Sequence, residues 1–155
     1  MSHTSPITAP LTEHVSKSQW EDVVEHRAIS TNKANPPAGP YNQGIAWNNL
    51  VYTASVGTTN PAYGVAPAGD IRAAARNALE NVKAILEAAG SDLEHVLHVT
   101  LYLNDMEDFA AINEVYTTYF TGIRPARSLV RVGGARGACS FDAVGYVPTN
   151  REEKG

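Results

Sequence analysis

Residues 70–103 read DIRAAARNALENVKAILEAAGSDLEHVLHVTLYL, and this stretch decides the fold that the sequence predicts. Its first twenty residues place apolar side chains three and four positions apart, which is typical of an amphipathic helix, and Gly90 follows as a stop signal. Residues 96–103 then alternate between two faces, as a strand does. The side chains expected on the more apolar face are Leu97, Val99, Leu101 and Leu103.

Shorter elements surround this helix and strand on both sides. Two apolar runs, 44–47 and 50–55, flank Asn48-Asn49 and predict a β-hairpin, because Asn tolerates the positive φ of a tight turn. A second helix is predicted from Met106 to Phe120 on the same periodicity as the first. Three further strands are predicted, and they are Ala28–Ser30, Ser128–Val132 and Cys139–Val147. The Gly-rich segment 133–137 is interpreted as a hairpin rather than a phosphate cradle because a strand follows it, and the Pro- and Gly-rich segment 60–69 as a loop.

This order of elements predicts an α+β fold, in which a mixed sheet carries two helices on one face. The second face would stay open, and its Leu- and Val-rich strands favour a homo-oligomer that pairs sheet faces. The chain has 155 residues, of which 43% are hydrophobic, and this suits one packed core. We therefore expect a single domain over residues 23–150, with a flexible N-terminal arm at 1–22 and a C-terminal tail at 151–155.

Composition excludes several classes of protein and site. The net charge of −4 argues against a nucleic-acid partner, and no apolar run approaches the roughly 20 residues of a membrane helix. A single cysteine, Cys139, excludes an internal disulfide framework and is interpreted as a core residue. With no secretory signal pattern, a cytoplasmic location is expected. No metal site is expected either, since the closest histidines, His95 and His98, lie at odd spacing.

Arg127 is the most informative charged residue. It follows Pro125-Ala126 at the entrance to a predicted strand, in an apolar context where a guanidinium needs a partner. One interpretation is a structural salt bridge, for instance with Asp142. The other is a bidentate clamp for the carboxylate of a ligand, which the planar guanidinium favours. The residue pattern alone leaves both open.

Five segments, taken together and in this order, resemble the RidA (YjgF-like) enamine/imine deaminase family. The resemblance runs from about Ala28 to Val147. The segments are GPYNQG at 39–44, NVKAILEAAG at 81–90, DFAAINEVY at 108–116, PARS at 125–128 and FDAVGYVP at 141–148.

This resemblance implies a homotrimer of chorismate-mutase-like protomers with ligand clefts at the subunit interfaces. It also implies hydrolysis of small carboxylate-bearing enamines or imines, such as 2-aminoacrylate or 2-iminopropanoate, to a 2-keto acid and ammonia without a cofactor. Two alternatives remain: a tautomerase or cyclase that acts on an imine without hydrolysis, and a trimer that binds ligands without catalysis.

The resemblance also assigns residues to the cleft. Arg127 corresponds to the arginine that holds the substrate carboxylate, and the backbone of Leu129 to a donor for the same group. Tyr41 and Asn113 correspond to residues that line the cleft. Ser55 stands where the family has a glycine, and its side chain would enlarge the wall of the cleft.

The glutamate that activates water in the family has two possible counterparts. Counting from Arg127 gives Asp142, whereas matching the last strand gives Ser140, and both point to the same strand face. The expected catalytic set is therefore Arg127, Asp142 and Ser140. The loop 120–125 is short and adds Arg124 as a second cation near the cleft.

Overall fold

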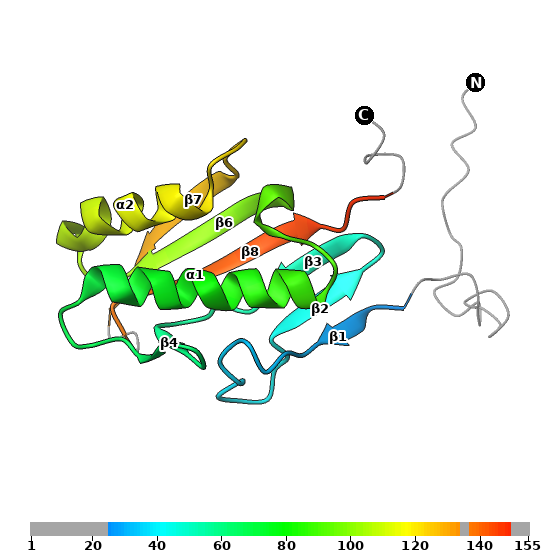
Figure 1. Cartoon of the computed structure of the whole chain (residues 1–155), viewed down its shortest axis with the longest axis horizontal. Helices are drawn as coiled ribbons and strands as arrows, with labels where there is room; N and C mark the ends of the chain where they lie inside the picture. The colour runs from blue at the N-terminus through cyan, green and yellow to red at the C-terminus, as the bar shows by residue number, and fades with distance from the viewer. Residues whose placement is uncertain (1–24, 134–136, 150–155) are drawn as a thin grey trace, which may run out of the picture.

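The structure is a computed structural model of the chain and describes residues 25–133 and 137–149. The arm and tail expected at 1–22 and 151–155 lie outside these ranges. Six strands form one mixed sheet in the order β1-β2-β3-β8-β6-β7, in which only β6 and β7 run parallel (Figure 1). The strands are β1 (Arg27–Ile29), β2 (Gly44–Trp47), β3 (Leu50–Thr53), β6 (Val96–Leu103), β7 (Ala126–Arg131) and β8 (Cys139–Tyr146).

Two helices, α1 (Ile71–Ala88) and α2 (Phe109–Tyr119), lie on one face of this sheet (Figure 1). Short 3-10 turns, η2 (Leu93–His95) and η3 (Met106–Asp108), precede β6 and α2. The predicted α+β architecture is thus confirmed. We call the sheet face that the helices leave uncovered the open face. No helix among the described residues is both long enough and apolar enough to cross a bilayer.

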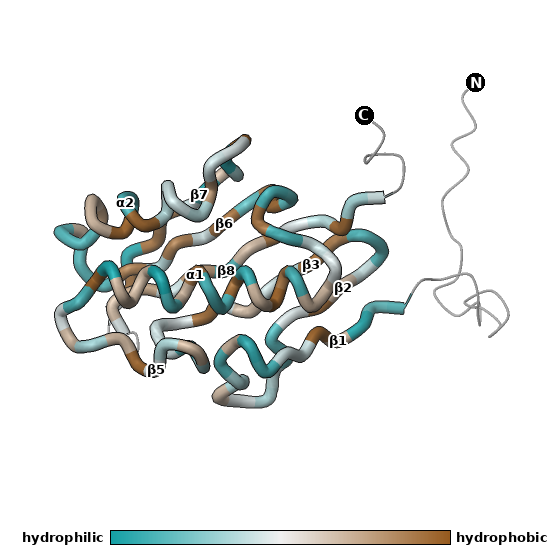
Figure 2. The backbone as a smooth tube through the Cα atoms, viewed as in Figure 1, coloured by the Kyte–Doolittle hydropathy of each residue, from teal (hydrophilic) through white to brown (hydrophobic). Residues whose placement is uncertain are grey.

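The helix α1 forms where the periodicity predicts it. Asp70 caps its N-terminus by accepting a hydrogen bond from the backbone N–H of Ala73 at 3.0 Å, and Gly90 follows its end with φ of 90°. Hydrophobic and hydrophilic residues follow one another in turn along the helix (Figure 2). The hydrophobic residues gather on one side of it, and this side faces the sheet. Residues Ala75, Ala78, Leu79, Val82, Ile85 and Leu86 are buried on that side.

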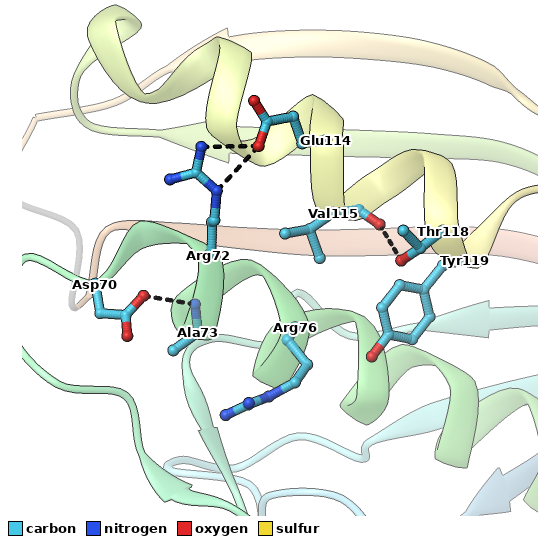
Figure 3. A pocket seen from close by; sticks show the side chains of 8 residues that line it. All are labelled: Asp70, Arg72, Ala73, Arg76, Glu114, Val115, Thr118 and Tyr119. Carbon is cyan, nitrogen blue, oxygen red and sulfur yellow. Dashed lines mark hydrogen bonds and ion pairs between the residues drawn. The ribbon is translucent and has the colours of Figure 1, made fainter.

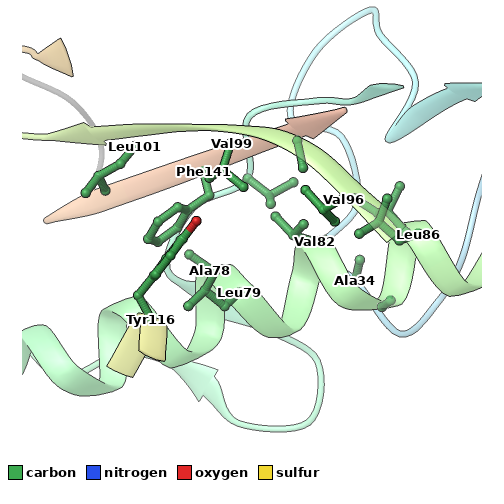
Figure 4. Close-up of a cluster of buried hydrophobic side chains, with 14 of the residues drawn as sticks. Ala34, Ala78, Leu79, Val82, Leu86, Val96, Val99, Leu101, Tyr116 and Phe141 are labelled. Atoms are coloured by element: carbon green, nitrogen blue, oxygen red, sulfur yellow. The ribbon is translucent and has the colours of Figure 1, made fainter. Parts of the chain in front are cut away.

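The hydrophobic core lies between the helices and the sheet. Phe141 of β8 and Leu101 of β6 are fully buried there, and the ring of Tyr116 from α2 stacks on Phe141 with 6.1 Å between centroids (Figure 4). Burial of each such large side chain contributes about 1.5–3 kcal/mol to stability. The core therefore fixes α2 against the centre of the sheet.

The strand 96–103 departs from strict alternation at its start. Leu97 is 49% exposed, whereas Val96 is buried, because a β-bulge lies between Val96 and His98 in the pairing with β8. The bulge adds one residue to the strand, so Val96 rather than Leu97 lies on the buried face. The prediction that Leu97 shares the apolar face was wrong, while Val99, Leu101 and Leu103 are buried as expected.

Two predictions about connections were also wrong. β7 and β8 do not form a hairpin, because β6 lies between them and pairs with both. The chain passes from β6 through α2 to a parallel β7, and β8 pairs with the other edge of β6. The segment expected to be a loop contains a small ladder of β4 (Thr59–Asn60) and β5 (Gly64–Val65). The hairpin around Asn48 is present, and Asn48 has φ of 51°.

At Gly44 the backbone of β2 lies close to α1. A Cβ atom there would lie 2.8 Å from Ile85 Cγ2 and 3.2 Å from the Tyr52 carbonyl oxygen. We expect Gly44→Ala to lower the free energy of unfolding by about 1–3 kcal/mol, because neither neighbour can withdraw without disturbing the core. Urea denaturation measures this. Gly122→Ala, where a Cβ meets nothing within 4 Å, is the control, and equal effects of the two variants would contradict the argument.

Candidate functional site

Arg127 lies on the helix-covered side of β7, at the edge of the sheet. Its Cα partner on β6 is Val99, which is buried beneath the helices. The guanidinium carbon of Arg127 lies 4.6 Å from the ring centroid of Tyr116 and 5.6 Å from that of Phe109. Both rings belong to α2. These rings stabilise the cation without neutralising it. Among the described residues Arg127 has no hydrogen bond or ion pair, so its donors remain available to a ligand.

Asp142 lies on the opposite face of the sheet from Arg127. Its Cα partner on β6 is Thr100, the residue after Val99, and consecutive residues of a strand point to opposite faces. The Asp142 carboxylate accepts a hydrogen bond from the Tyr102 hydroxyl at 2.8 Å. This hydrogen bond, together with burial, raises the pKa of Tyr102 above its ordinary value. The structural salt bridge considered between Arg127 and Asp142 does not form.

Ser140 also lies on the open face, two residues before Asp142, but has a different neighbour. The Ser55 hydroxyl donates a hydrogen bond to the Ser140 hydroxyl oxygen at 3.0 Å. Val56 and Phe141 exchange two backbone hydrogen bonds, of 2.9 and 3.1 Å, and this bridge holds the two serines side by side. Ser140 thus lies beside Ser55, the residue expected in the wall of the cleft, whereas the Asp142 carboxylate is hydrogen-bonded to Tyr102.

Tyr41 and Ser55 line the same pocket, which has a volume of about 560 Å³. The Tyr41 ring is half exposed, and its hydroxyl accepts a hydrogen bond from the Ala38 N–H at 3.0 Å. Buried Gln43 fixes the segment 31–35 at both ends. Its side-chain amide donates hydrogen bonds to the carbonyls of Thr31 and Asn35 and accepts one from the Thr31 N–H. The remaining lining residues are Asn42, Gly44, Ile45, Tyr52, Thr53 and Ala54.

Asn113 and Leu129 lie on the Arg127 side of the molecule. Phe109, Asn113 and Tyr116 follow one another at helical spacing, so Asn113 shares the helix face that Arg127 touches. Leu129 is two residues after Arg127 on β7 and therefore points to the same sheet face. Its side chain is 38% exposed, so it is not a core residue.

The predicted site residues therefore form two separate groups. The first group, Tyr41, Ser55 and Ser140, lies around β3 and β8, and the second, Arg127, Leu129 and Asn113, lies around β7 and α2. β3 and β7 are three strand positions apart, which corresponds to about 14 Å across the sheet. The structure does not bring the two groups together within one chain. Tyr116 and Phe109, which hold Arg127, were missed from the sequence, although their spacing with Asn113 is a visible signal.

A second groove runs between α1 and α2 on the outer side of the helices (Figure 3). Its volume is about 520 Å³, and two of the four charged side chains that line it form an ion pair with each other. Arg72 bonds Glu114 at 2.7 Å, and the hydroxyl of Tyr119 donates to Glu80 at 2.7 Å. None of the predicted site residues lines this groove, so we do not assign the site to it.

The described residues offer no metal site and no activated thiol. They contain no group of three or more His, Cys, Asp or Glu side chains that could hold a metal ion. Cys139 is buried, and burial raises the pKa of its thiol to about 12. A thiol with that pKa is protonated at neutral pH and is a poor nucleophile. The chemistry available to the two groups is that of hydroxyls, an amide and a guanidinium, and the Asp142 carboxylate belongs to neither group.

The chain is similar in sequence and fold to known proteins. The family model described as Endoribonuclease L-PSP matches residues 31–140. The chain is 48% identical to the RutC family protein PH0854 of Pyrococcus horikoshii over 104 residues, which are 67% of this chain and 82% of that protein. It is 40% identical over 109 residues to the 2-iminobutanoate/2-iminopropanoate deaminase of Escherichia coli K12, covering 68% of this chain and 84% of that one. Its structure resembles Escherichia coli TdcF with bound serine, with a TM-score of 0.73, 35% identity and coverage of 77% and 98%.

Proposed function

The chain belongs to the RidA (YjgF-like) family, and from this membership we propose that it hydrolyses small enamine or imine carboxylates to a 2-keto acid and ammonia. The substrate class is that of 2-aminoacrylate and 2-iminopropanoate, and the reaction uses no cofactor. One observation carries the proposal. The guanidinium of Arg127 is held against two aromatic rings and has no carboxylate partner among the described residues. A planar cation in that state suits a ligand carboxylate.

The active unit that we propose is a homotrimer, in which each cleft lies between two protomers. Arg127, Leu129 and Asn113 of one protomer would face Tyr41, Ser55 and Ser140 of the next. This arrangement explains why the two groups lie about 14 Å apart on different faces of a single chain. The open face supplies the apolar surface for such an assembly, since Trp47 and Tyr52 are both about half exposed there.

The chemistry needs little acid–base assistance once the carboxylate is bound. Protonation of the enamine at its β-carbon gives an iminium ion, in which the carbon bonded to nitrogen is electrophilic. Water adds to the carbon bonded to nitrogen, a proton moves from the added oxygen to the amino group, and cleavage of the C–N bond releases ammonia while the hydroxyl loses its proton to leave the keto group. We propose that the Ser55 and Ser140 hydroxyls, 3.0 Å apart, hold the attacking water. Two hydroxyls can orient water but cannot act as a carboxylate base at neutral pH.

The same hydroxyl pair favours a second candidate function. Since the nearest carboxylate on the strand, Asp142, is hydrogen-bonded to Tyr102, the cleft could promote a proton shift within an imine without adding water. The product would then be an isomer or a cyclic compound. The two candidates differ in one observable, because only hydrolysis releases free ammonia together with the 2-keto acid.

Substitution of the two strand residues tests the proposal. We expect Ser140→Ala to lower the rate of ammonia release from 2-iminopropanoate by about 10–100-fold, because the water loses one of its partners. Asp142→Asn should change the rate by less than about 3-fold, since an amide still accepts the Tyr102 hydrogen bond. The imine is generated in the assay by oxidation of alanine. A larger loss in Asp142→Asn than in Ser140→Ala would show that the water lies at Asp142, and isomerised product without ammonia would favour the second candidate.

A further inference from the structure

Two arginines, Arg124 and Arg127, lie near the C-terminal end of α2. The Nε of Arg124 donates a hydrogen bond of 3.4 Å to the carbonyl of Phe120, the residue that ends the helix. The ring of Phe120 packs on that of Tyr116 with 4.5 Å between centroids, and the guanidinium of Arg127 lies over the same Tyr116 ring. Arg127 thus contacts this aromatic pair through the Tyr116 ring, and Arg124 contacts it through the Phe120 backbone.

Electrostatics supports this proximity. Burial raises the pKa of Tyr116, and the positive charges of Arg127 and Arg124 both oppose that rise. Both guanidinium groups are therefore close enough to act on the same hydroxyl. Because only two residues separate them, their Cα atoms lie at most about 11 Å apart. Two long side chains whose Cα atoms lie this close together can bind two groups of one small ligand.

No negative group of the described chain neutralises these two cations. Arg72, on α1, forms an ion pair with Glu114, but neither Arg124 nor Arg127 forms one within residues 25–133 and 137–149. The Arg124 hydrogen bond to Phe120 uses its Nε and leaves both terminal nitrogens as donors. Two like charges held near each other repel, and a ligand that carries two negative groups removes that repulsion.

We infer that the substrate carries a second anionic group, and that Arg124 binds this group while Arg127 binds the carboxylate next to the imine. The class of substrate is the imines of amino dicarboxylic acids with four or five carbon atoms. This inference rests on the proposed function in one respect only, the role of Arg127 as the carboxylate clamp. Arg124 thereby determines specificity and takes no part in the bond-forming steps.

Ligand binding tests the inference without requiring turnover. The two probes are 2-oxoglutarate and 2-oxopentanoate, which share a five-carbon chain and differ in the terminal carboxylate. Calorimetric titration of the wild-type protein should show at least about 10-fold tighter binding of 2-oxoglutarate. Arg124→Gln should remove that preference and leave the affinity for 2-oxopentanoate within about 2-fold. Arg72→Gln is the matched control, because it removes a surface arginine of α1 and should leave the preference unchanged.

Several outcomes would overturn the inference. These are equal affinities for the two acids in the wild-type protein, loss of both affinities in Arg124→Gln, and absence of binding by either acid. Arg124 is exposed, so thermal melting should show its variant folded. Turnover is measured separately with the imines formed by oxidation of glutamate and norvaline. A retained preference in binding with no ammonia release would refute the proposed hydrolysis and support the assignment of Arg124.

Discussion

Arg127→Gln is expected to lower kcat/KM for 2-iminopropanoate by about 10²–10³-fold while the protein remains folded. Each charge-assisted hydrogen bond to a carboxylate contributes about 1.5–3 kcal/mol, and glutamine loses the charge and the two-pronged geometry together. A combined loss of about 3–4 kcal/mol gives that factor. Ammonia release measured at several substrate concentrations separates the effects on KM and kcat, and most of the loss should appear in KM.

Two further variants complete this experiment. Arg127→Lys keeps the charge but not the planar fork, so it should lie between the wild type and Arg127→Gln. Arg72→Gln changes an exposed arginine in the outer groove and should leave kcat/KM within about 2-fold. Activity of Arg127→Gln equal to that of the wild type would show that the carboxylate is bound elsewhere.

Mixing of two inactive variants tests whether each cleft draws on two protomers. Arg127→Gln and Ser140→Leu, unfolded and refolded together in equal amounts, should regain activity. With random assembly, about one quarter of the interfaces in a trimer pair an intact Arg127 with an intact Ser140. The expected activity is therefore about one quarter of the wild-type value. Activity no higher than that of the separate variants would place both groups of each cleft in one chain.

The elements of this fold that depend on local pattern were predictable. The helix over residues 71–88 and the strand over 96–103 show their periodicity in the residues themselves. The predictions that were wrong concern which strands become neighbours in the sheet and in which register they pair. The bulge at Leu97 and the position of β6 between β7 and β8 arise from pairing over long distances in the sequence. Local alternation specifies a face but does not specify a partner.

The candidate site shows the same division. Arg127 could be singled out from its position between Pro125-Ala126 and an apolar strand. That Asp142 lies on the opposite face from Arg127 could not be found, because it depends on the register of both strands against β6. The role of Tyr116 as a support for Arg127 depends on how α2 lies across the sheet. The chemistry was thus visible in residue types, while the geometry required tertiary packing.

Asn81 is the residue whose loss should most disturb the segments that lead to the cleft. It is fully buried in α1, and its side chain makes four hydrogen bonds to two other segments, one at Asn35 and one over residues 57–60. It donates to the carbonyls of Gly57 and Thr59, at 3.1 and 2.7 Å. Its oxygen accepts from the Asn35 N–H at 3.1 Å and the Asn60 amide at 2.8 Å.

Asn81→Ala is expected to lower the free energy of unfolding by about 3–5 kcal/mol, because it leaves buried donors and acceptors unpaired as well as a cavity. Urea denaturation measures the loss, and Asn77→Ala is the matched control. Asn77 is equally buried in α1 and donates to Thr58 and Gly64, but its oxygen accepts only from the adjacent Arg76 of the same helix, so its loss leaves fewer groups of other segments unpaired and should cost less. Since Gly57 lies two residues after Ser55, Asn81→Ala should also weaken ligand binding at a temperature where the variant is still folded. Equal losses of stability in the two variants, with ligand binding unchanged, would show that Asn81 does not fix the wall of the cleft.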